Sequence, residues 1–538
     1  MTTNTPRMAT SDFDCIVVGA GHNGLVAACY LARAGFNIGV FERRDMAGGA
    51  VATEEMFGGY RMDVGGSAHI MIHLTPIVRE LELERFGLEY IEMDPFAWHP
   101  TEDGRWLAYY RDVDRTCESI ARISERDAES YRAFVEFWGA INDGVFDAFL
   151  RPPTPGNLLR TMMSGKWGRK KEVAATLRRI FTSYGQIVRE TFHSEPVRAS
   201  MLWLAAQSGP PPMEPATADF VGWHSMIHRS GARRPRGGSG MLTQALARRL
   251  ESDGGTVVLD APVRRIIIEN GRAVGIELES GERFGAKHGV VANSHVVTTM
   301  LSLVGREHLP AGLADRVENL RIGNGFGMVL RCASTELPNY TAMPHDAAAL
   351  DPRTPLDCHT GLQLLLPDTQ YLEHAYADYL RGLNSRDPAL LLMTFSAIDP
   401  SLAPPGRHTV YIWSQYHPYQ LADGANWDAI REGVADRLID TACRWAPNLR
   451  TAITDRYIQT PLDIERKHGM LRGNVMHLEM SFDQMFHFRP TPELSGYTTP
   501  IDRLYLTGAS THPGGGIFGA SGYNTAHVVM KRAGKRRR

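Results

Sequence analysis

Glycine is concentrated in two stretches of this chain, one near each end. The first reads Gly19-Ala20-Gly21-His22-Asn23-Gly24, and the second, Gly514 to Gly522, holds five glycines in nine residues. Glycine loses more conformational freedom on folding than any other residue, so such stretches are kept where the backbone adopts unusual dihedrals or approaches another group closely. Both stretches therefore predict a bound group that lies directly against the backbone.

The elements around the first stretch occur in a recognisable order. Asp14 to Val18 is a short apolar run, and the segment LVAACYLARAG after Gly24 has helical spacing up to Gly35. A second apolar run then ends on Glu42, 23 residues after Gly19. Strand, glycine turn, helix, strand and terminal acid form the dinucleotide-binding fingerprint, which is far more specific than the glycines alone.

Each residue of this fingerprint has a predicted role. Gly19 permits the tight turn, Gly21 lets a pyrophosphate approach the backbone, and Gly24 lets the helix pack on the strand. Glu42 is expected to accept hydrogen bonds from ribose hydroxyls, which suits FAD or NAD. We interpret the neighbouring Arg43-Arg44 as a solvated loop rather than as an NADP site.

The following segments separate FAD from NAD. ERRDMAGGAVAT and YRMDVGGSAH resemble the extended FAD motif of the flavoprotein family that includes phytoene desaturases and amine oxidases. The resemblance implies cofactor contacts at Gly48, Gly49, Gly66 and Ser67. Much of that family has an arginine after the double glycine, where this chain has Ala50, so that contact is missing or comes from elsewhere.

A second piece of the FAD-binding domain is predicted in the middle of the chain. An amphipathic helix, a strand and a hairpin around Asn270-Gly271 follow one another, and Asn-Gly between apolar runs is a strong hairpin signal. This order resembles the flavoprotein family, in which the residue matching Val263 holds the adenine through its backbone. Gly237 to Gly240 does not follow a predicted strand, so we do not count it as a second nucleotide fingerprint.

The C-terminal glycine stretch is the predicted cradle of the flavin ring. IDRLYLTG is expected to be a strand that delivers Gly508 and Ala509, and a helix is expected to begin near Gly519 and Ala520. A helix N-terminus carries roughly half a positive charge. Aimed at the flavin N1–C2=O edge, it would favour the reduced flavin.

These motifs predict an α/β fold: a Rossmann-type FAD-binding domain assembled from discontinuous segments, with an α+β substrate domain that includes a helical region. The apolar stripe from Phe134 to Phe149 is typical of a packed helix, with a substrate tunnel or a membrane-facing wall as the alternative. The expected order is a first FAD-binding segment (Rossmann βαβ) at 12–111, a helical substrate or membrane-facing region at 112–230, a second FAD-binding segment at 231–305, the substrate domain at 306–490, a third FAD-binding segment with the flavin loop and helix at 491–530, and a basic tail at 531–538.

Composition limits the partners. The net charge of -2 offers no electrostatic case for a nucleic acid, and the six cysteines form no CxxC pair. No metal site is predicted. The first fourteen residues lack a signal-peptide core, and no apolar run of about 18 residues occurs. We therefore expect a cytoplasmic protein whose lipophilic substrate and basic tail are compatible with peripheral contact with the inner face of the membrane; the oligomeric state stays open.

Five segments spread over the whole chain sharpen the resemblance to the bacterial β-carotene ketolases of the phytoene desaturase type. They are GHNGLVAACYLARAG, GGSAHIMIH, QSGPPPMEP, the long segment RYIQTPLDIERKHGMLRGNVMHLEMSFDQM and LYLTGASTHPGGGIFGASG. The resemblance implies a long conjugated isoprenoid substrate and a 4-keto product. We expect hydride removal from an allylic carbon by the flavin, capture by water and a second oxidation.

Four polar residues are the candidate catalytic groups. His477, Glu479 and Asp483 lie in the long family-specific segment, and His512 lies beside the predicted flavin loop. Each of them is also typical of a structural hydrogen-bond partner. The alternatives are a carotenoid desaturase or another amine-oxidase-like flavoprotein, and, in a different class, a non-enzymatic isoprenoid-binding escort. The glycine stretch contains no cysteine, which disfavours the amine oxidases that bind their flavin covalently.

Overall fold

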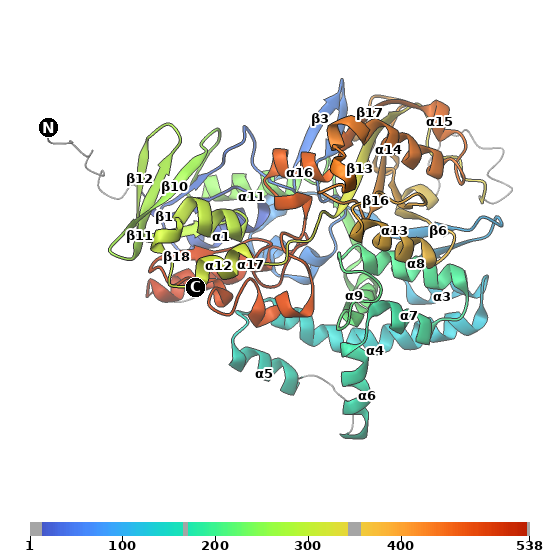
Figure 1. Cartoon of the computed structure of the whole chain (residues 1–538), viewed down its shortest axis with the longest axis horizontal. Coiled ribbons are helices and arrows are strands. Elements are labelled where there is room, and N and C mark those ends of the chain that lie inside the picture. Colours follow the sequence, from blue (N-terminus) through green and yellow to red (C-terminus); the bar gives the residue numbers. More distant parts are fainter. Residues whose placement is uncertain (1–12, 165–169, 343–356, 535–538) are drawn as a thin grey trace.

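The computed structural model describes residues 13–164, 170–342 and 357–534. Figure 1 shows two β-sheets set side by side, with a group of helices below the second. Residue 12 and residues 535–538, which include most of the predicted basic tail, lie outside the described residues.

The first sheet is assembled from three distant regions of the chain. Its parallel strands are ordered β9-β2-β1-β12-β18, and β12 continues into the antiparallel β11 and β10. The bounds are β1 (Phe13–Val18), β2 (Ile38–Phe41), β9 (Thr256–Val258), β10 (Val263–Glu269), β11 (Arg272–Leu278), β12 (Arg283–Ala292) and β18 (Leu504–Leu506). This discontinuous Rossmann-type arrangement confirms the predicted fold class.

Three helices pack together against this sheet: α1 (His22–Arg33), α11 (Met241–Ser252) and α17 (Ala520–Arg532). Figure 1 shows α1 beside α17, although the two are separated by almost the whole sequence. The hairpin predicted at Asn270-Gly271 joins β10 to β11, and both turn residues have positive φ.

The second sheet is the core of the substrate domain, in the order β17-β13-β16-β15-β14-β6-β7. Its last two strands, β6 (Ala97–Pro100) and β7 (Trp106–Tyr109), come from the range predicted for the first FAD-binding segment. The others are β13 (Gly327–Ser334), β14 (Leu362–Leu365), β15 (Ala389–Met393), β16 (His408–Gln415) and β17 (Ile453–Gln459), with α13 (Gln370–Leu380) and α14 (Trp427–Ala442) on this side of the molecule.

The helical region begins with α3 (Val113–Ala121) and the 25-residue α4 (Glu125–Phe149). Phe134, Trp138 and Phe149 on α4 are buried, as expected for a packed helix. None of the described helices combines the length and the apolar character that crossing a bilayer requires. The remaining elements are α2 (Ile77–Glu80), α5 (Pro155–Ser164), α6 (Lys170–Phe181), α7 (Tyr184–Thr191), α8 (Glu195–Ala206), α9 (Ala218–Gly222), α10 (Ile227–Ser230), α12 (Leu313–Glu318), α15 (Leu449–Ala452), α16 (Pro461–His468), β3 (Thr53–Phe57), β4 (Tyr60–Asp63), β5 (Tyr90–Met93) and β8 (Ala232–Pro235), besides short 3-10 turns.

The turn at Gly237 to Gly240 corrects one expectation, because it directly follows strand β8, which pairs with β5. Its N–H groups are nevertheless occupied by the chain's own acids: Gly237 donates to Asp399 over 2.6 Å and Ser239 donates to Asp63 over 2.8 Å. The turn therefore joins distant segments of the protein and does not present its amides to a phosphate.

Candidate active site

The first glycine turn forms a bare cradle at the carboxyl end of β1. Gly19 has φ +97°, and a Cβ on Gly24 would lie 2.5 Å from the Gly19 carbonyl oxygen. Gly21 caps α1 without any side-chain hydrogen bond, and the first turn of α1 contains no acid. Free N–H groups at a helix N-terminus without a competing carboxylate fit a pyrophosphate.

Glu42 lies at the carboxyl end of β2 and is 7% exposed. Its Oε2 accepts a hydrogen bond from the Ala20 N–H over 2.8 Å, which ties the acid to the glycine turn. Ala261 donates its N–H to the Glu42 carbonyl over 2.8 Å, so the start of β10, with Val263, lies next to this acid. A carboxylate has further lone pairs, so Glu42 retains acceptor capacity for ribose hydroxyls.

The two arginines after Glu42 differ from each other. Arg43 is exposed, as expected for a solvated loop. Arg44 corrects that expectation, because its side chain is only 14% exposed and forms an ion pair with Glu54. Arg44 therefore holds β3 to this loop.

The second glycine motif meets the first. Gly48 donates its N–H to the Ala20 carbonyl over 2.9 Å, and a Cβ on Gly49 would lie 3.3 Å from the Gly21 Cα. A Cβ on Gly66 would lie 2.5 Å from the side chain of Ile517, in the C-terminal glycine loop. Ser67, buried, follows directly. The structure thus brings residues predicted from three separate motifs to one place.

Asn293 connects the two glycine stretches and was missed from the sequence. It follows β12, and its Nδ2 donates to the carbonyls of Gly19 over 3.1 Å and Gly21 over 3.4 Å. A Cβ on Gly508 would lie 2.9 Å from the Asn293 Oδ1. The available signal was a polar residue directly after a buried strand.

The C-terminal loop runs from Gly508 and Ala509, after β18, to Gly519, the N-cap of α17. Gly519 has φ +77°, and α17 has no side-chain cap and no acid in its first turn. Ala520 is fully buried at the first position of this helix. A Cβ on Gly522 would lie 2.0 Å from the Asn23 carbonyl oxygen, so the glycine lets the first turns of α17 and α1 touch. Two helix N-termini free of acids therefore lie side by side.

His477 is held by a serine and a second histidine, neither of them predicted. Its Nδ1 lies 2.9 Å from the Ser510 Oγ. The His295 ring stacks on the His477 ring at 4.9 Å between centroids, and the His295 Nε2 donates to the His477 carbonyl over 3.0 Å. Burial, followed by the charges of His295 and Arg489, holds the pKa of His477 well below its usual value. The imidazole is therefore neutral at physiological pH.

His512 lies in apolar surroundings and is 1% exposed. Its ring contacts those of Phe149 and Phe486 at centroid distances of 5.6 and 5.8 Å. The Nε2 lies 3.3 Å from the Ala148 carbonyl, whereas the buried Nδ1 has no hydrogen-bond partner within the portion of the chain that the structure describes. Burial lowers the pKa of His512 to about 4, which keeps this ring neutral as well.

Glu479 and Asp483 belong to a separate network. Their carboxylates lie 2.7 and 3.2 Å from the guanidinium of Arg321. Glu479 and Arg321 line a crevice whose walls are mainly aromatic residues, prolines and methionines: Pro210, Pro211, Phe326, Tyr376, Tyr379, Tyr416, Met476 and Met480. The four catalytic candidates thus divide into two histidines at the glycine loop and two acids paired with an arginine at this crevice.

Arg489 joins the family-specific segment to the glycine loop. Its fully buried guanidinium donates to the Met476 and Ala509 carbonyls, each over 2.7 Å, and to further carbonyls of the same segment. No local pattern of residue types points to this arginine, because all its acceptors are main-chain atoms.

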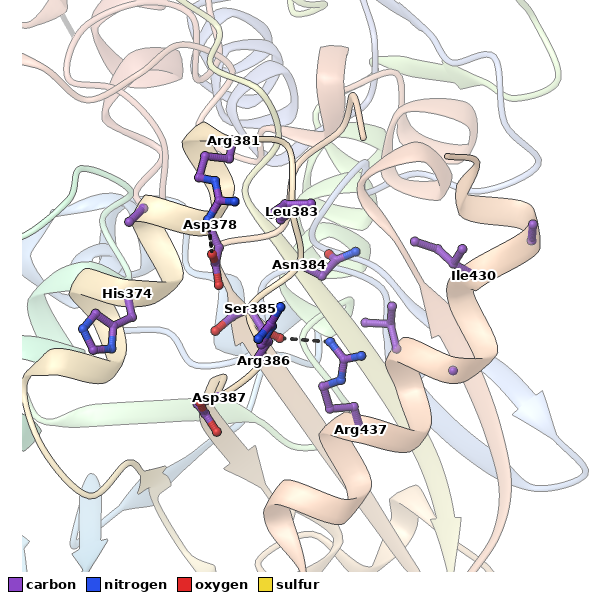
Figure 2. Close-up of a pocket in the computed structure, with 14 residues that line it drawn as sticks. His374, Asp378, Arg381, Leu383, Asn384, Ser385, Arg386, Asp387, Ile430 and Arg437 are labelled. Atoms are coloured by element: carbon purple, nitrogen blue, oxygen red, sulfur yellow. Dashed lines mark hydrogen bonds and ion pairs between the residues drawn. The ribbon is translucent and has the colours of Figure 1, made fainter. Parts of the chain in front are cut away.

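A hollow of about 890 Å³ lies elsewhere, on the substrate domain between α13 and α14. Figure 2 shows its mixed lining, with Asp378 and Arg381 on one side and Arg437 of α14 donating to Ser385 over 3.3 Å. None of the predicted site residues lines it. Neither there nor elsewhere among the described residues do three His, Cys, Asp or Glu side chains gather as metal ligands would.

The comparisons with known proteins agree with this geometry. Residues 24–333 match the family described as flavin containing amine oxidoreductase. Pyridine nucleotide-disulfide oxidoreductase domain-containing protein 2 of Rattus norvegicus is 31% identical over 553 residues, covering 97% of this chain and 94% of that protein. A limonene dehydrogenase polypeptide of Castellaniella defragrans is 31% identical over 542 residues, covering 97% and 95%.

Two further similarities extend over nearly the whole chain. The lycopene-forming phytoene desaturase of Pseudescherichia vulneris is 27% identical over 528 residues, covering 96% of this chain and 99% of that protein. The crystal structure of an oxidoreductase from Methanosarcina mazei has the same fold, with a TM-score of 0.61, 17% identity and coverage of 96% and 99%. The chain is therefore an FAD-dependent oxidoreductase and belongs to the flavin-containing amine oxidoreductase family, within the superfamily of FAD-dependent amine oxidases and phytoene desaturases.

Proposed function

We propose that this FAD-dependent oxidoreductase oxidises a lipophilic isoprenoid, in its specific form a β-carotene 4-ketolase-like oxidation of a carotenoid. The observation that carries the proposal is a cluster of aromatic rings packed on the glycine loop. We call Phe146, Phe149, Trp223, Phe486 and Phe518 the aromatic cluster. Phe518 belongs to the loop itself, and its ring lies 5.7 Å from that of Phe149.

The aromatic cluster favours an apolar substrate because it offers ring faces and few charges. His512, which contacts two of its rings, is neutral. The carboxyl of Asp219, which accepts a hydrogen bond from the Trp223 Nε1 over 2.6 Å, has its pKa raised to about 7 by burial. Apolar, unsaturated molecules bind well to such a surface, whereas a cationic amine would lack a permanent counter-charge.

The residues that we propose to hold FAD are the three glycine motifs with Glu42, Ser67, Val263 and the start of α17. When bound, FAD supplies two-electron oxidation. Loss of a hydride equivalent from an allylic carbon leaves a cation that the polyene delocalises, and water captures it. Neutral His477 or His512 then takes the proton of that water as general base. A second two-electron oxidation converts the alcohol to a ketone, with molecular oxygen as the final electron acceptor.

The relatives support an isoprenoid substrate in general terms. Limonene dehydrogenase and phytoene desaturase are named for isoprenoid hydrocarbons. A carotenoid desaturase is therefore the second candidate, since loss of a proton from the same allylic cation would give a double bond in place of the alcohol. The ketolase form rests on the resemblance of the segment from Gln459 to Met485.

The deciding experiment uses the purified protein reconstituted with FAD and given β-carotene in liposomes, with products separated by chromatography and identified by mass. A keto-carotenoid that forms only with FAD is the expected result. Phytoene and limonene are tested in parallel, and a desaturated product would favour the second candidate. If none of the three is oxidised while FAD stays bound, the isoprenoid proposal is wrong.

We also propose that the crevice side of the molecule touches a lipid surface. Phe181, Met213 and Phe482 are 51, 49 and 43% exposed, and the rings of Phe181 and Phe482 lie 5.6 Å apart. Met213 precedes Glu214 and Phe482 follows Ser481, both of which line the crevice. A lipophilic substrate reaches a site from a bilayer more readily than from water, so an apolar rim here has a use.

Sedimentation with anionic liposomes tests this contact. The double variant F181S/F482S is expected to lose most of the lipid-bound fraction. L380S is the matched control, because Leu380 is 68% exposed but lies at the end of α13. Equal binding of both variants and the wild type would contradict the proposal.

A further inference from the structure

Arg489 is the most unusual charged group next to the glycine loop. Its side chain is fully buried, and it takes part in no ion pair among the residues that the structure describes. Burying a charge without a counter-ion is expensive unless hydrogen bonds replace its hydration. Such a group is retained in a protein for a reason other than stability alone.

Main-chain carbonyls replace the hydration of this guanidinium. Nη2 donates to the Met476 and Ala509 oxygens, each over 2.7 Å, and Nε donates to the Ala509 oxygen over 3.1 Å. Nη1 donates to the oxygens of Glu479 over 3.2 Å and Gln484 over 3.1 Å. Carbonyl dipoles satisfy the donors but carry no net charge, so the positive charge is not cancelled by these contacts.

The charge lies directly under the glycine loop. Nε is 3.5 Å from the point that a Cβ on Gly514 would occupy. The neighbouring imidazoles of His295, His477 and His512 have pKa values lowered by burial and further by the charge of Arg489, so they stay neutral. Burial lowers the pKa of Arg489 itself to about 9, which leaves it cationic at neutral pH.

We propose that Arg489 is the fixed cation of the flavin site, a positioning residue that locks the segment 476–484 onto the glycine loop and whose uncancelled charge favours the reduced cofactor. A hydride brings one hydrogen nucleus and two electrons, so accepting it adds one negative charge to the flavin. A cation held in a buried, low-dielectric site lowers the energy of that product. The inference rests on the FAD site proposed above.

The two-electron midpoint potential of the bound FAD is the direct readout, measured by equilibration with reference dyes in the absence of substrate. In R489M and R489Q the charge is gone, and we expect the potential to fall by at least about 30 mV, which is tenfold in the reduction equilibrium. R489K keeps a charge, and its potential is expected to stay closer to that of the wild type. R316M is the matched control, because Arg316 is 48% exposed and pairs with Glu493 at the surface.

The outcomes are separable. A potential unchanged in R489M and R489Q, or lowered equally in R489K, would overturn the electrostatic role of Arg489. If neither neutral variant folds, R489K alone decides, because a buried lysine loses its proton at lower pH than arginine does. Its potential must then fall below that of the wild type as pH rises, and parallel profiles overturn the inference. Because no substrate is present, failure to oxidise an isoprenoid would count against the proposed function and not against this role.

Discussion

At the scale of single residues, His477 and His512 are both neutral but are held in different ways. Ser510 accepts the Val296 N–H over 3.0 Å, so its own hydroxyl hydrogen is available to the Nδ1 of His477. The Nδ1 of His512 is buried, and no partner for it occurs among the described residues. Leaving a buried polar atom unpaired costs about 1–3 kcal/mol. Of the two rings, His512 is therefore the one with a free atom that a ligand would satisfy.

The same burial predicts that acid destabilises the protein. The pKa of His512 is about 4 in the folded state, below the ordinary value of about 6.5 that it regains on unfolding. Between these two values the unfolded chain binds a proton that the folded chain does not, so the free energy of unfolding rises with pH and falls on acidification. The variant H512N should take up about one proton fewer on unfolding near pH 5.

Denaturant unfolding at several pH values measures this proton uptake as the slope of stability against pH. F486L is the control, because it alters the same surroundings without removing a titrating group. A slope equal in H512N and the wild type would contradict the buried, neutral ring.

Asp483 is expected to contribute little to the reaction, although the sequence makes it a candidate base. Its side chain is 59% exposed and that of Arg321 is 49% exposed, and ion pairs between exposed groups are worth at most about 1 kcal/mol. We expect kcat/KM of D483N to stay within about fivefold of the wild type. Steady-state kinetics beside H477Q provides the comparison, and a loss in D483N as large as in H477Q would restore Asp483 as a base.

At the scale of elements, the contact between α1 and α17 depends on one glycine. A Cβ on Gly522 would lie 2.0 Å from the Asn23 carbonyl oxygen, which is main chain and cannot move aside easily. G522A should therefore lower the free energy of unfolding by at least about 2 kcal/mol and weaken FAD retention, because both helix N-termini shift. Thermal unfolding and the flavin content of the purified protein measure the two effects.

Gly433 supplies the control for that variant. It lies inside α14, where a Cβ would meet nothing within 4 Å. G433A should leave FAD content unchanged and raise stability by about 0.5–1 kcal/mol, the usual preference for alanine in a helix. If G522A behaves like G433A, the first turns of the two helices are not in contact.

Elements with local signals could be predicted, and those that depend on distant pairing could not. The turn at Gly19 to Gly24 and the hairpin at Asn270-Gly271 occur as predicted, because glycine and Asn-Gly act through their own dihedrals. The pairing of β6 with β14, more than 250 residues away, has no local signature. Nor have Asn293 and Arg489, whose contacts are carbonyls brought near by the fold. Of the site, the sequence therefore indicates the glycines and His477 but not what holds them.

At the scale of the whole molecule, a buried ion cluster joins the two sheets. Asp63 on β4 pairs with Arg234 on β8 over 2.9 Å, and both side chains are fully buried. Asp63 also accepts the Ser239 N–H over 2.8 Å, at the turn before α11. From the substrate sheet, Arg331 on β13 donates to the Val64 carbonyl over 2.6 Å. The two halves thus meet through charged groups as well as through apolar contacts.

The last prediction concerns this cluster, because the cost of breaking it should spread across the molecule. D63N removes the carboxylate and leaves the guanidinium of Arg234 buried without a counter-ion, which costs about 3–5 kcal/mol. D103N breaks the surface pair with Arg105, whose side chains are 53 and 52% exposed, and should cost less than about 1 kcal/mol. Denaturant unfolding followed by tryptophan fluorescence and by flavin release tests both variants. We expect the two signals to coincide in D103N and the flavin to leave first in D63N, since Asp63 fixes the turn before α11 that packs on α1. Coincident signals and equal midpoints in the two variants would mean that the sheets are held together by their apolar contacts alone.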